Sequence, residues 1–381
     1  MFSTLSAAQI PLNCPEFSGN ELIYAARALA SGLQTGGEFS NRCGRWLAQE
    51  CGAEHVHLVQ SATAGLELAM LMSGVGPGDE VILPSYTFVS CANAVALRGA
   101  TPVFAEIDAA TLTLDPAAAA AAVTGRTRAI IVVHYAGVPC EMDTIRRLAD
   151  RNGLLVIEDA AQALLSRYRG RPAGSLGDIG VFSFHHTKNV TCGEGGAVVV
   201  NTAGLSRRAE IFHQKGTDRS AFDRGTRQKY TWIDLGSSFA PSEITAAVLL
   251  AQLEKAHEIT ERRRAIWANY HAAFAELEAR GCVRRPVVPD YINHNGHLFY
   301  LLLENEDARD ALILHMQKRG IVTPFHYVPL HDSPGGLRYA RSATPLPITE
   351  SVASRLVRLP LWPGIDSRQN EVIGEVTAAL R

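Results

Sequence analysis

Several features that would assign this chain to a special class of protein are absent from its sequence. No window approaches 18 uninterrupted apolar residues, so we expect no membrane-spanning helix. The segment from Met1 to Ser6 lacks a basic start followed by an apolar stretch, which argues against a secretory signal and favours a cytoplasmic protein. The formal net charge is -2 and no long run of Lys or Arg occurs, so we expect neither nucleic acid nor a membrane as a partner.

The cysteine content argues against two further classes. The seven cysteines form an odd set with wide, irregular spacing and no C-x-x-C pair, so we expect neither a disulfide framework nor a zinc site. The adjacent His185 and His186 cannot share one face of a helix or strand, which argues against a metal site there. The cysteines are Cys14, Cys43, Cys51, Cys91, Cys140, Cys192 and Cys282.

The chain does contain enough apolar material for a folded protein of enzyme size. Of its 381 residues, 47% are hydrophobic and 19% are charged, which suffices for one large domain and a smaller one. Short apolar runs alternate with helical patterns between about residues 51 and 201, which predicts an α/β fold with a mostly parallel sheet covered by helices. The seven expected strands are 55–60, 80–83, 101–108, 128–135, 154–159, 180–184 and 196–201.

Helical patterns surround these strands and continue beyond them. Expected helices are 20–30, 40–51, 63–73, 117–122 and 143–151, the last closed by Asn152 and Gly153. A single long helix is expected over 242–278, and it would bridge to a second domain. After Pro286 we expect a strand at 297–303, a helix at 307–319, a strand around 321–328, and closing helices from Ser351 and Ser367. We therefore divide the chain into a large domain, 1–245, and a bridging helix with a small α+β domain, 246–381.

Two residues of opposite charge stand at the ends of buried-looking strands, where parallel α/β sheets bind their ligands. Lys188 follows the apolar run from Val181 to Phe184 and precedes the turn Gly193-Glu194-Gly195-Gly196, a setting typical of an amine that forms an imine. Taken alone, such a lysine is more often a solvated surface residue. Asp159 ends another strand, and its charge needs a partner: the N-terminus of a following helix, or a protonated heteroaromatic nitrogen.

Two further segments follow strands at the same edge of the expected sheet. Ser61-Ala62-Thr63 opens a helix, and the free N–H groups of that first turn suit a phosphate, although an ordinary helix cap is the simpler interpretation. The segment Pro84 to Phe88 ends in an aromatic side chain that could lie on a planar ring or pack in the core.

Together and in this order, these motifs resemble those of the DegT/DnrJ/EryC1/StrS family of sugar aminotransferases. The resemblance spans nearly the whole chain and implies the type I fold of pyridoxal phosphate (PLP) enzymes. It also implies a homodimer with active sites at the subunit interface. The motifs that carry it are Ser61 to Thr63, Pro84 to Phe88, Glu158 to Gln162, Ser183 to Asn189 and Gly193 to Gly196.

Four other segments are most similar to the dTDP-4-amino-4,6-dideoxygalactose transaminases of that family: 134–137, 215–220, 229–232 and 325–331. This subgroup aminates a dTDP-linked 4-keto-6-deoxy sugar, typically with glutamate as donor, for cell-surface polysaccharide. We therefore expect transfer of an amino group from L-glutamate to C4 of a nucleotide-linked 4-keto-6-deoxy sugar, with dTDP-4-keto-6-deoxyglucose as the acceptor. Pyridoxamine phosphate (PMP) would be the intermediate form of the cofactor.

The resemblance also implies roles for individual residues. Lys188 would be the Schiff-base lysine that moves the proton, and Asp159 the partner of the pyridine nitrogen. Gln162 would lie near the ring and its phenolic oxygen, and Phe88 would stack on the ring. Phosphate contacts are expected from Ala62, Thr63 and Ser183.

One position departs from the family pattern. Most members place an Asn from a Gly-Tyr-Asn-Tyr motif against the neighbouring subunit's cofactor phosphate, whereas this chain has Ser238 within Gly236-Ser237-Ser238-Phe239. The subgroup named above shares Gly-Ser-Ser, and the shorter hydroxyl would make that contact directly or through water. Ser238 is therefore kept as a cofactor contact.

Substrate contacts are expected on both sides of the site. Lys215, Arg219 and Lys229 could meet the sugar nucleotide's diphosphate, from the same or the partner subunit, and each could equally be a solvated surface charge. A second set, His326, Tyr327 and His331, resembles the family's sugar-side wall, with an ordinary structural role as the alternative for each histidine.

Three other functions remain to be compared with this one. Deoxygenation of a sugar at C3 is catalysed by relatives in which His replaces the lysine, so Lys188 argues against it. Amination at C3, or of a different nucleotide sugar, is compatible with the fold motifs. A PLP-binding protein without turnover is disfavoured because every expected catalytic side chain is present.

Overall fold

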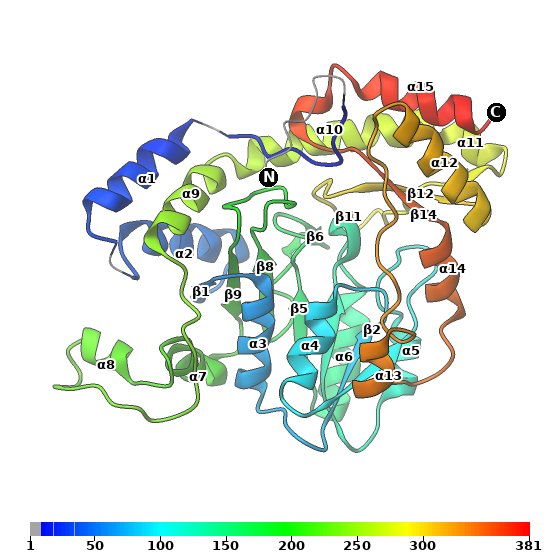
Figure 1. The fold of residues 1–381 in the computed structure, drawn as a ribbon. Helices are drawn as coiled ribbons and strands as arrows, with labels where there is room; N and C mark the ends of the chain where they lie inside the picture. Colours follow the sequence, from blue (N-terminus) through cyan, green and yellow to red (C-terminus); the bar gives the residue numbers. More distant parts are fainter. Residues whose placement is uncertain (1–8, 18, 34) are drawn as a thin grey trace.

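The centre of the molecule is a sheet of eight strands with helices on both faces (Figure 1). The structure is a computed structural model that describes residues 9–17, 19–33 and 35–381. The segment from Met1 to Ser6 therefore lies outside the described residues. The strand order is β1 (His55–Val59), β9 (Gly196–Val200), β8 (Ile179–Ser183), β5 (Leu155–Asp159), β4 (Thr127–Val133), β2 (Glu80–Pro84), β3 (Thr101–Ala105) and β13 (Arg341–Ser342).

All seven expected strands are confirmed, and they form the α/β fold that the pattern predicts. Strand β9 runs antiparallel to both β1 and β8, whereas the other pairs are parallel. The expected number of seven was one too low, because the C-terminal part of the chain returns Arg341 and Ser342 to pair with β3. Two residues are too few to show a strand pattern in the sequence.

The two faces of the sheet bury alternate residues of each strand, as the period of two requires. On β2, Val81 and Leu83 pack with α3 (Ala62–Ser73), α4 (Val89–Ala96) and α7 (Ala203–His213). Ile82 packs on the opposite face with α5 (Pro116–Ala122) and α6 (Met142–Asn152). That face continues across β8 and β9 under α2 (Glu38–Cys51) and α9 (Glu243–Leu253), and α1 (Asn20–Ala30) packs on α9.

The helices expected in the first half of the chain are confirmed to within two residues. Helix α6 ends as predicted at Gly153, which adopts the left-handed conformation with φ 64° and so allows the chain to reverse. Helix α2 begins at Glu38, two residues before the expected start. A short helix, α8 (Arg219–Asp223), and a three-residue turn at Tyr135–Gly137 were not predicted.

The single bridging helix expected over 242–278 is wrong, because the chain forms three helices there. These are α9, α10 (Ala256–Ala273) and α11 (Ala275–Ala279), separated at Glu254–Lys255 and at Phe274. Helix α9 packs in the core under the large sheet, whereas α10 contributes Ile266 and Tyr270 to the C-terminal core. Glu254 and Lys255 at the first break are good helix formers, so that interruption comes from the need to face two different cores.

The C-terminal part contains a second sheet in the order β10 (Val283–Arg284), β12 (Phe299–Leu303) and β14 (Leu356–Leu359), all antiparallel. In Figure 1 these strands and the helices around them lie above the large sheet. Strand β12 was predicted and β14 was missed. A small third sheet joins β6 (Arg167–Tyr168), β7 (Arg171–Pro172) and β11 (Ile292–Asn293). The surrounding helices are α12 (Glu306–Lys318), α13 (Pro334–Tyr339), α14 (Pro347–Arg355), the turn Pro363–Ile365 and α15 (Gln369–Ala379).

The strand expected around 321–328 is also wrong. Only Ile321 makes a bridge, to Ile10, and the following residues run beside β14 without forming a ladder. The backbone N–H of Arg358 donates to Pro324 O at 2.9 Å, and its side chain donates to Phe325 O, which holds this segment against β14. The helix expected from Ser351 begins at Pro347 and ends at Arg355, where β14 starts.

Two predictions from the sequence concern larger-scale properties. No helix in the described part of the chain is long and apolar enough to cross a membrane. The division into domains at residues 245 and 246 stays a prediction.

Candidate active site

A cavity of about 620 Å³ lies at the carboxyl ends of the parallel strands, between the large sheet and the C-terminal elements. This is where α/β folds of this class place their ligands. Its lining comes from the ends of β1, β4, β5 and β8 and from the segments around His326 and Arg358. Most of the residues predicted for the site line it: Ala62, Thr63, Phe88, Asp159, Gln162, Ser183, Lys188, His326 and Tyr327.

Lys188 lies in the loop that joins β8 to β9. The loop closes on itself where Phe184 N donates to Gly195 O at 2.8 Å and Cys192 N donates to Phe184 O at 3.0 Å. Burial of the amine lowers the pKa of Lys188 to about 8; Asp159 opposes this change and the positive charge of Arg358 adds to it. More of the amine is therefore unprotonated near neutral pH than in an exposed lysine, and nucleophilic attack and proton removal both require the unprotonated form.

Asp159 ends β5 and is 7% exposed, with its carboxylate held on both oxygens. Oδ1 accepts the backbone N–H of Ala161 at 3.0 Å, and Oδ2 accepts the thiol of Cys91 at 2.9 Å. Burial, followed by the nearby charge of Asp159, raises the pKa of Cys91 well above its usual value, so the thiol keeps its proton and donates it. Turns rather than a helix follow Asp159, so a helix N-terminus is not its partner.

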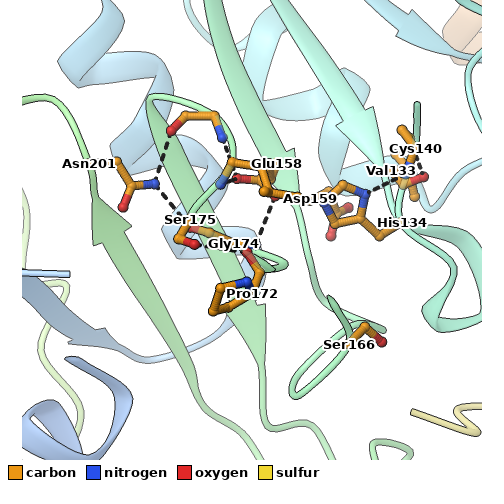
Figure 2. A network of polar contacts seen from close by, with 12 residues as sticks. Val133, His134, Cys140, Glu158, Asp159, Ser166, Pro172, Gly174, Ser175 and Asn201 are labelled. Carbon is orange, nitrogen blue, oxygen red and sulfur yellow. Dashed lines mark hydrogen bonds and ion pairs between the residues drawn. The ribbon is translucent and has the colours of Figure 1, made fainter. Parts of the chain in front are cut away.

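A buried network holds the other side of β5 (Figure 2). Glu158, next to Asp159 and pointing to the opposite face, accepts backbone N–H groups of Gly174 at 2.8 Å and of Leu176 and Gly177 at 2.6 Å. His134 Nε2 lies 2.7 Å from the same carboxylate. The backbone carbonyl of Asp159 also accepts the N–H of His134 at 3.1 Å. These five hydrogen bonds, four to Glu158 and one to Asp159, fix the end of the strand that carries Asp159.

The opposite end of the cavity is the first turn of α3. Ser61 caps this helix by accepting the N–H of Ala64 at 3.1 Å, so the simpler interpretation of this motif is confirmed. The cap leaves the N–H groups of Ala62 and Thr63 at the positive end of the helix dipole, where an anion binds favourably. Gly196 allows β9 to approach, since a Cβ there would lie 2.7 Å from Ala62 N.

Helix α4 supplies the side wall. Phe88, its N-cap residue, lines the cavity and is 56% exposed, which places it on the cavity surface rather than in the core. Two residues later, Ser90 Oγ lies 2.7 Å from Thr63 Oγ1 and also lines the cavity. The next residue is Cys91, which reaches Asp159, so one turn of α4 contacts both ends of the site.

Gln162, His326 and Tyr327 form a connected wall on the C-terminal side. Gln162 accepts the N–H of Ala136 at 2.7 Å through Oε1 and donates through Nε2 to the hydroxyl of Tyr327 at 2.8 Å. His326 Nδ1 lies 2.8 Å from the hydroxyl of Tyr135. Burial lowers the pKa of His326 well below its usual value, so this ring is neutral.

Five predicted residues lie outside the cavity. Lys215, Arg219, Lys229 and Ser238 belong to an exposed segment around α8, which lies at the lower left in Figure 1. His331 is held elsewhere, with Nδ1 2.8 Å from Ser85 Oγ and Nε2 3.3 Å from Glu350. Its role as a substrate contact stays a prediction.

The sequence interpretation missed several cavity residues, among them Ser90, Arg263, His297 and Arg358. Ser90 and the neighbouring Cys91 follow Phe88 closely on one helix, and that spacing could have identified them. No pattern marks Arg263 or Arg358, which come from α10 and β14 and reach the cavity only through the packing of the C-terminal elements.

Comparisons with known proteins agree with this geometry. The DegT/DnrJ/EryC1/StrS aminotransferase family matches residues 16–378. The crystal structure of S. venezuelae DesV in complex with a ketimine intermediate is 37% identical, covers 98% of this chain and 99% of that chain, and has a TM-score of 0.88.

Two further solved structures are similar over the same length. The aminotransferase TlmJ from Streptoalloteichus hindustanus is 32% identical over 97% of this chain and 98% of its own, with a TM-score of 0.89. A protein from Streptococcus pneumoniae described as a sugar aminotransferase, solved in its PMP form, is 26% identical over 98% of both chains, with a TM-score of 0.90. The family match over nearly the whole chain is decisive: this protein belongs to the DegT/DnrJ/EryC1/StrS aminotransferase family.

Proposed function

We propose that this protein is a PLP-dependent aminotransferase that moves an amino group from L-glutamate to C4 of a nucleotide-linked 4-keto-6-deoxy sugar. Aminotransferases of this family use PLP, as the motifs predicted. The observation that carries the proposal for this chain is the placement of Lys188 and Asp159 on one cavity, although 28 intervening residues separate them in the sequence.

The cavity fits the cofactor by its chemistry. The first turn of α3 offers free N–H groups and a dipole to a phosphate, with the hydroxyls of Thr63 and Ser183 beside it. Phe88 offers an aromatic face to a flat ring, and Asp159 a buried carboxylate to a protonated ring nitrogen. When bound, PLP supplies the electron sink that makes a proton on the donor carbon acidic.

The chain's own groups supply proton transfer and orientation. Lys188, with its pKa lowered to about 8, takes the proton from the donor carbon and returns it. Cys91 and Ala161 hold the carboxylate of Asp159 in place, each through one hydrogen bond. Both substrates use this cavity in turn, so ping-pong kinetics are expected.

The acceptor is inferred from segments resembling one subgroup, of which 325–331 contributes His326 and Tyr327 to the cavity wall. The second candidate is amination at C3, or of a different nucleotide sugar, since those reactions need the same cofactor groups. The expected location of such an enzyme is the cytoplasm, where nucleotide sugars are made for cell-surface polysaccharide.

We also propose a homodimer in which the exposed segment around α8 reaches the partner's cavity. This segment carries the predicted anion contacts and Ser238, together with exposed apolar side chains such as Trp232, which is 75% exposed. Burial of such surface is typical of an interface between subunits. Sedimentation of the purified protein tests the dimer, and a monomer that retains full activity would contradict it.

The decisive experiment starts with protein reconstituted with PLP. We expect a yellow protein whose visible absorbance is lost on addition of L-glutamate, with stoichiometric 2-oxoglutarate. Addition of dTDP-4-keto-6-deoxyglucose should then restore the absorbance and give an amino sugar, identified by mass and by its configuration at C4. Loss of absorbance without any sugar product would reject the acceptor and keep the aminotransferase.

A Lys188→Ala variant provides the test of mechanism. It should bind PLP with the absorption spectrum of the free aldehyde, and borohydride reduction should no longer attach the cofactor covalently to the chain. Turnover by this variant at the rate of the unmodified protein would end the assignment of Lys188.

A further inference from the structure

The C-terminal wall of the cavity contains an arginine whose charge has no acidic partner among the residues that the structure describes. Arg358 of β14 lines the cavity, and its Nε and Nη2 both donate to one carbonyl, Phe325 O, at 3.1 Å and 2.9 Å. A guanidinium carries five N–H donors, so most of its hydrogen-bonding capacity remains unused. No ion pair joins Arg358 to a carboxylate in the part of the chain that the structure describes.

The second arginine of the cavity is different. Arg263 is 2% exposed and donates through Nε to Gly296 O at 3.1 Å, through Nη2 to His297 O at 2.6 Å and through Nη1 to Asn13 Oδ1 at 3.3 Å. Each of its three nitrogens therefore has a partner, and the side chain ties α10 to the turn before β12. Arg358 is the guanidinium of the cavity that still has a nitrogen, Nη1, without an acceptor among the described residues.

The other charged and titratable groups that line the cavity are less suited than Arg358 to bind an anionic group of a substrate. Asp159 is held by Cys91 and Ala161, while Glu194 is largely solvent-exposed and lies 3.4 Å from His185. Burial lowers the pKa values of His297 and His326 well below the usual range, so both rings are neutral. Arg358 and Lys188 line the same cavity, and the positive charge of Arg358 also contributes to the lowered pKa of Lys188.

The two substrates carry their anionic groups at different places relative to the carbon that reacts, so a cation near Lys188 distinguishes between them. In an α-amino acid, a carboxylate is attached to the same carbon that loses its proton to Lys188. In a nucleotide sugar that reacts at C4, the diphosphate is attached at C1, across the hexose ring. Resting on the proposed aminotransferase function, we propose that Arg358 binds the α-carboxylate of the amino donor through its free Nη1 edge. In the second half-reaction the same edge meets hydroxyl groups of the sugar.

The test separates the two half-reactions in Arg358→Gln. For the first, the loss of cofactor absorbance is followed over a range of L-glutamate concentrations; for the second, its return is followed from the PMP form with the keto sugar. We expect the Kd for L-glutamate to rise by about 10- to 100-fold, as loss of a charge-assisted hydrogen bond predicts. The dependence on the keto sugar should change less than that on L-glutamate, because a neutral hydroxyl loses a hydrogen bond to the guanidinium but no ion pair.

Two further variants make the comparison specific. Arg358→Lys keeps the charge without the planar fork, so its Kd for L-glutamate should lie between those of the Gln variant and the unmodified protein. Arg355→Gln is the matched control: Arg355 also donates only to backbone carbonyls, Ser351 O at 3.0 Å and Leu303 O at 3.4 Å, and it does not line the cavity. Both half-reactions of this control should be unchanged. The Lys variant carries the test if the Gln variant does not fold.

The possible results have separate meanings. Unmodified protein that keeps its absorbance with every amino acid offered would reject the proposed function itself. A normal first half-reaction in both Arg358 variants would reject the role of Arg358 alone. Impairment confined to the keto-sugar half-reaction, or equal in both halves, would also overturn the proposal, because Arg358 would then be a sugar contact or a structural residue.

Discussion

Replacement of Glu158 by Gln is expected to destabilise the protein strongly although it removes no volume. Glu158 is fully buried, and each carboxylate oxygen accepts two donors. Oε1 accepts the N–H groups of Leu176 and Gly177, and Oε2 accepts that of Gly174 together with the Nε2–H of His134. The change exchanges one of these oxygens for an NH₂ group, which cannot accept a hydrogen bond.

The magnitude follows from counting donors. Whichever way the amide turns, two buried N–H groups would face an NH₂. The His134 ring cannot adapt by moving its proton, because its Nδ1 already accepts the N–H of Cys140 at 3.2 Å. An unmet buried polar group costs about 1–3 kcal/mol, so the free energy of unfolding should fall by about 2–6 kcal/mol. That is a large part of the total stability of about 5–15 kcal/mol that most proteins have.

The assay is equilibrium unfolding in urea, followed by both near-ultraviolet and far-ultraviolet circular dichroism. Two probes are needed because a chain of 381 residues can unfold in more than one step. The matched control is Glu371→Gln, which breaks an exposed ion pair with Arg368 and should change stability by less than about 0.5 kcal/mol. A decrease below about 1 kcal/mol for Glu158→Gln would refute the reasoning, since one unmet donor alone should cost that much.

The remaining predictions concern the cofactor site. In protein without PLP, labelling of Lys188 by an amine reagent should rise with pH through about 8, and labelling that begins only near 10.5 would contradict the lowered pKa. Because the folded pKa lies below the unfolded value of 10.5, the unfolded chain binds more protons between these values. Stability should therefore rise from pH 8 towards 10.5, with the cost of burying the charged amine fully present below pH 8. Cys91→Ala should weaken PLP binding, because Asp159 loses its thiol donor at 2.9 Å. Cys91→Ser keeps a donor and should largely retain PLP binding. Equal PLP affinities of the two variants in a titration would argue against the contact. Gly196→Ala should also weaken PLP binding, since the new Cβ would lie 2.7 Å from Ala62 N. An unchanged PLP affinity would contradict this and show that the first turn of α3 can shift without loss of binding.

The alternation of apolar runs and helical patterns determined the order of the strands along the chain and the edge of the sheet at which chemistry occurs. The carboxyl ends of parallel strands meet at one edge, so Asp159 and Lys188 were expected together from local signals alone. The start of α3 and Phe88 followed from the same rule, because a strand end and the next helix start are adjacent in the sequence.

Tertiary structure alone decided the features that depend on contacts between distant segments. Arg358 and Arg263 reach the cavity because the C-terminal sheet and α10 pack above the large sheet, and no local pattern records that packing. The helix predicted over 242–278 breaks at Glu254 and Lys255 because its two parts face different cores, although both of these residues favour a helix. His331 resembled a substrate contact by its position in a motif, yet its ring is held by Ser85 and Glu350 away from the cavity. Sequence periodicity indicates which face of a helix or strand is buried. Which other element packs on that face depends on the fold of the whole chain.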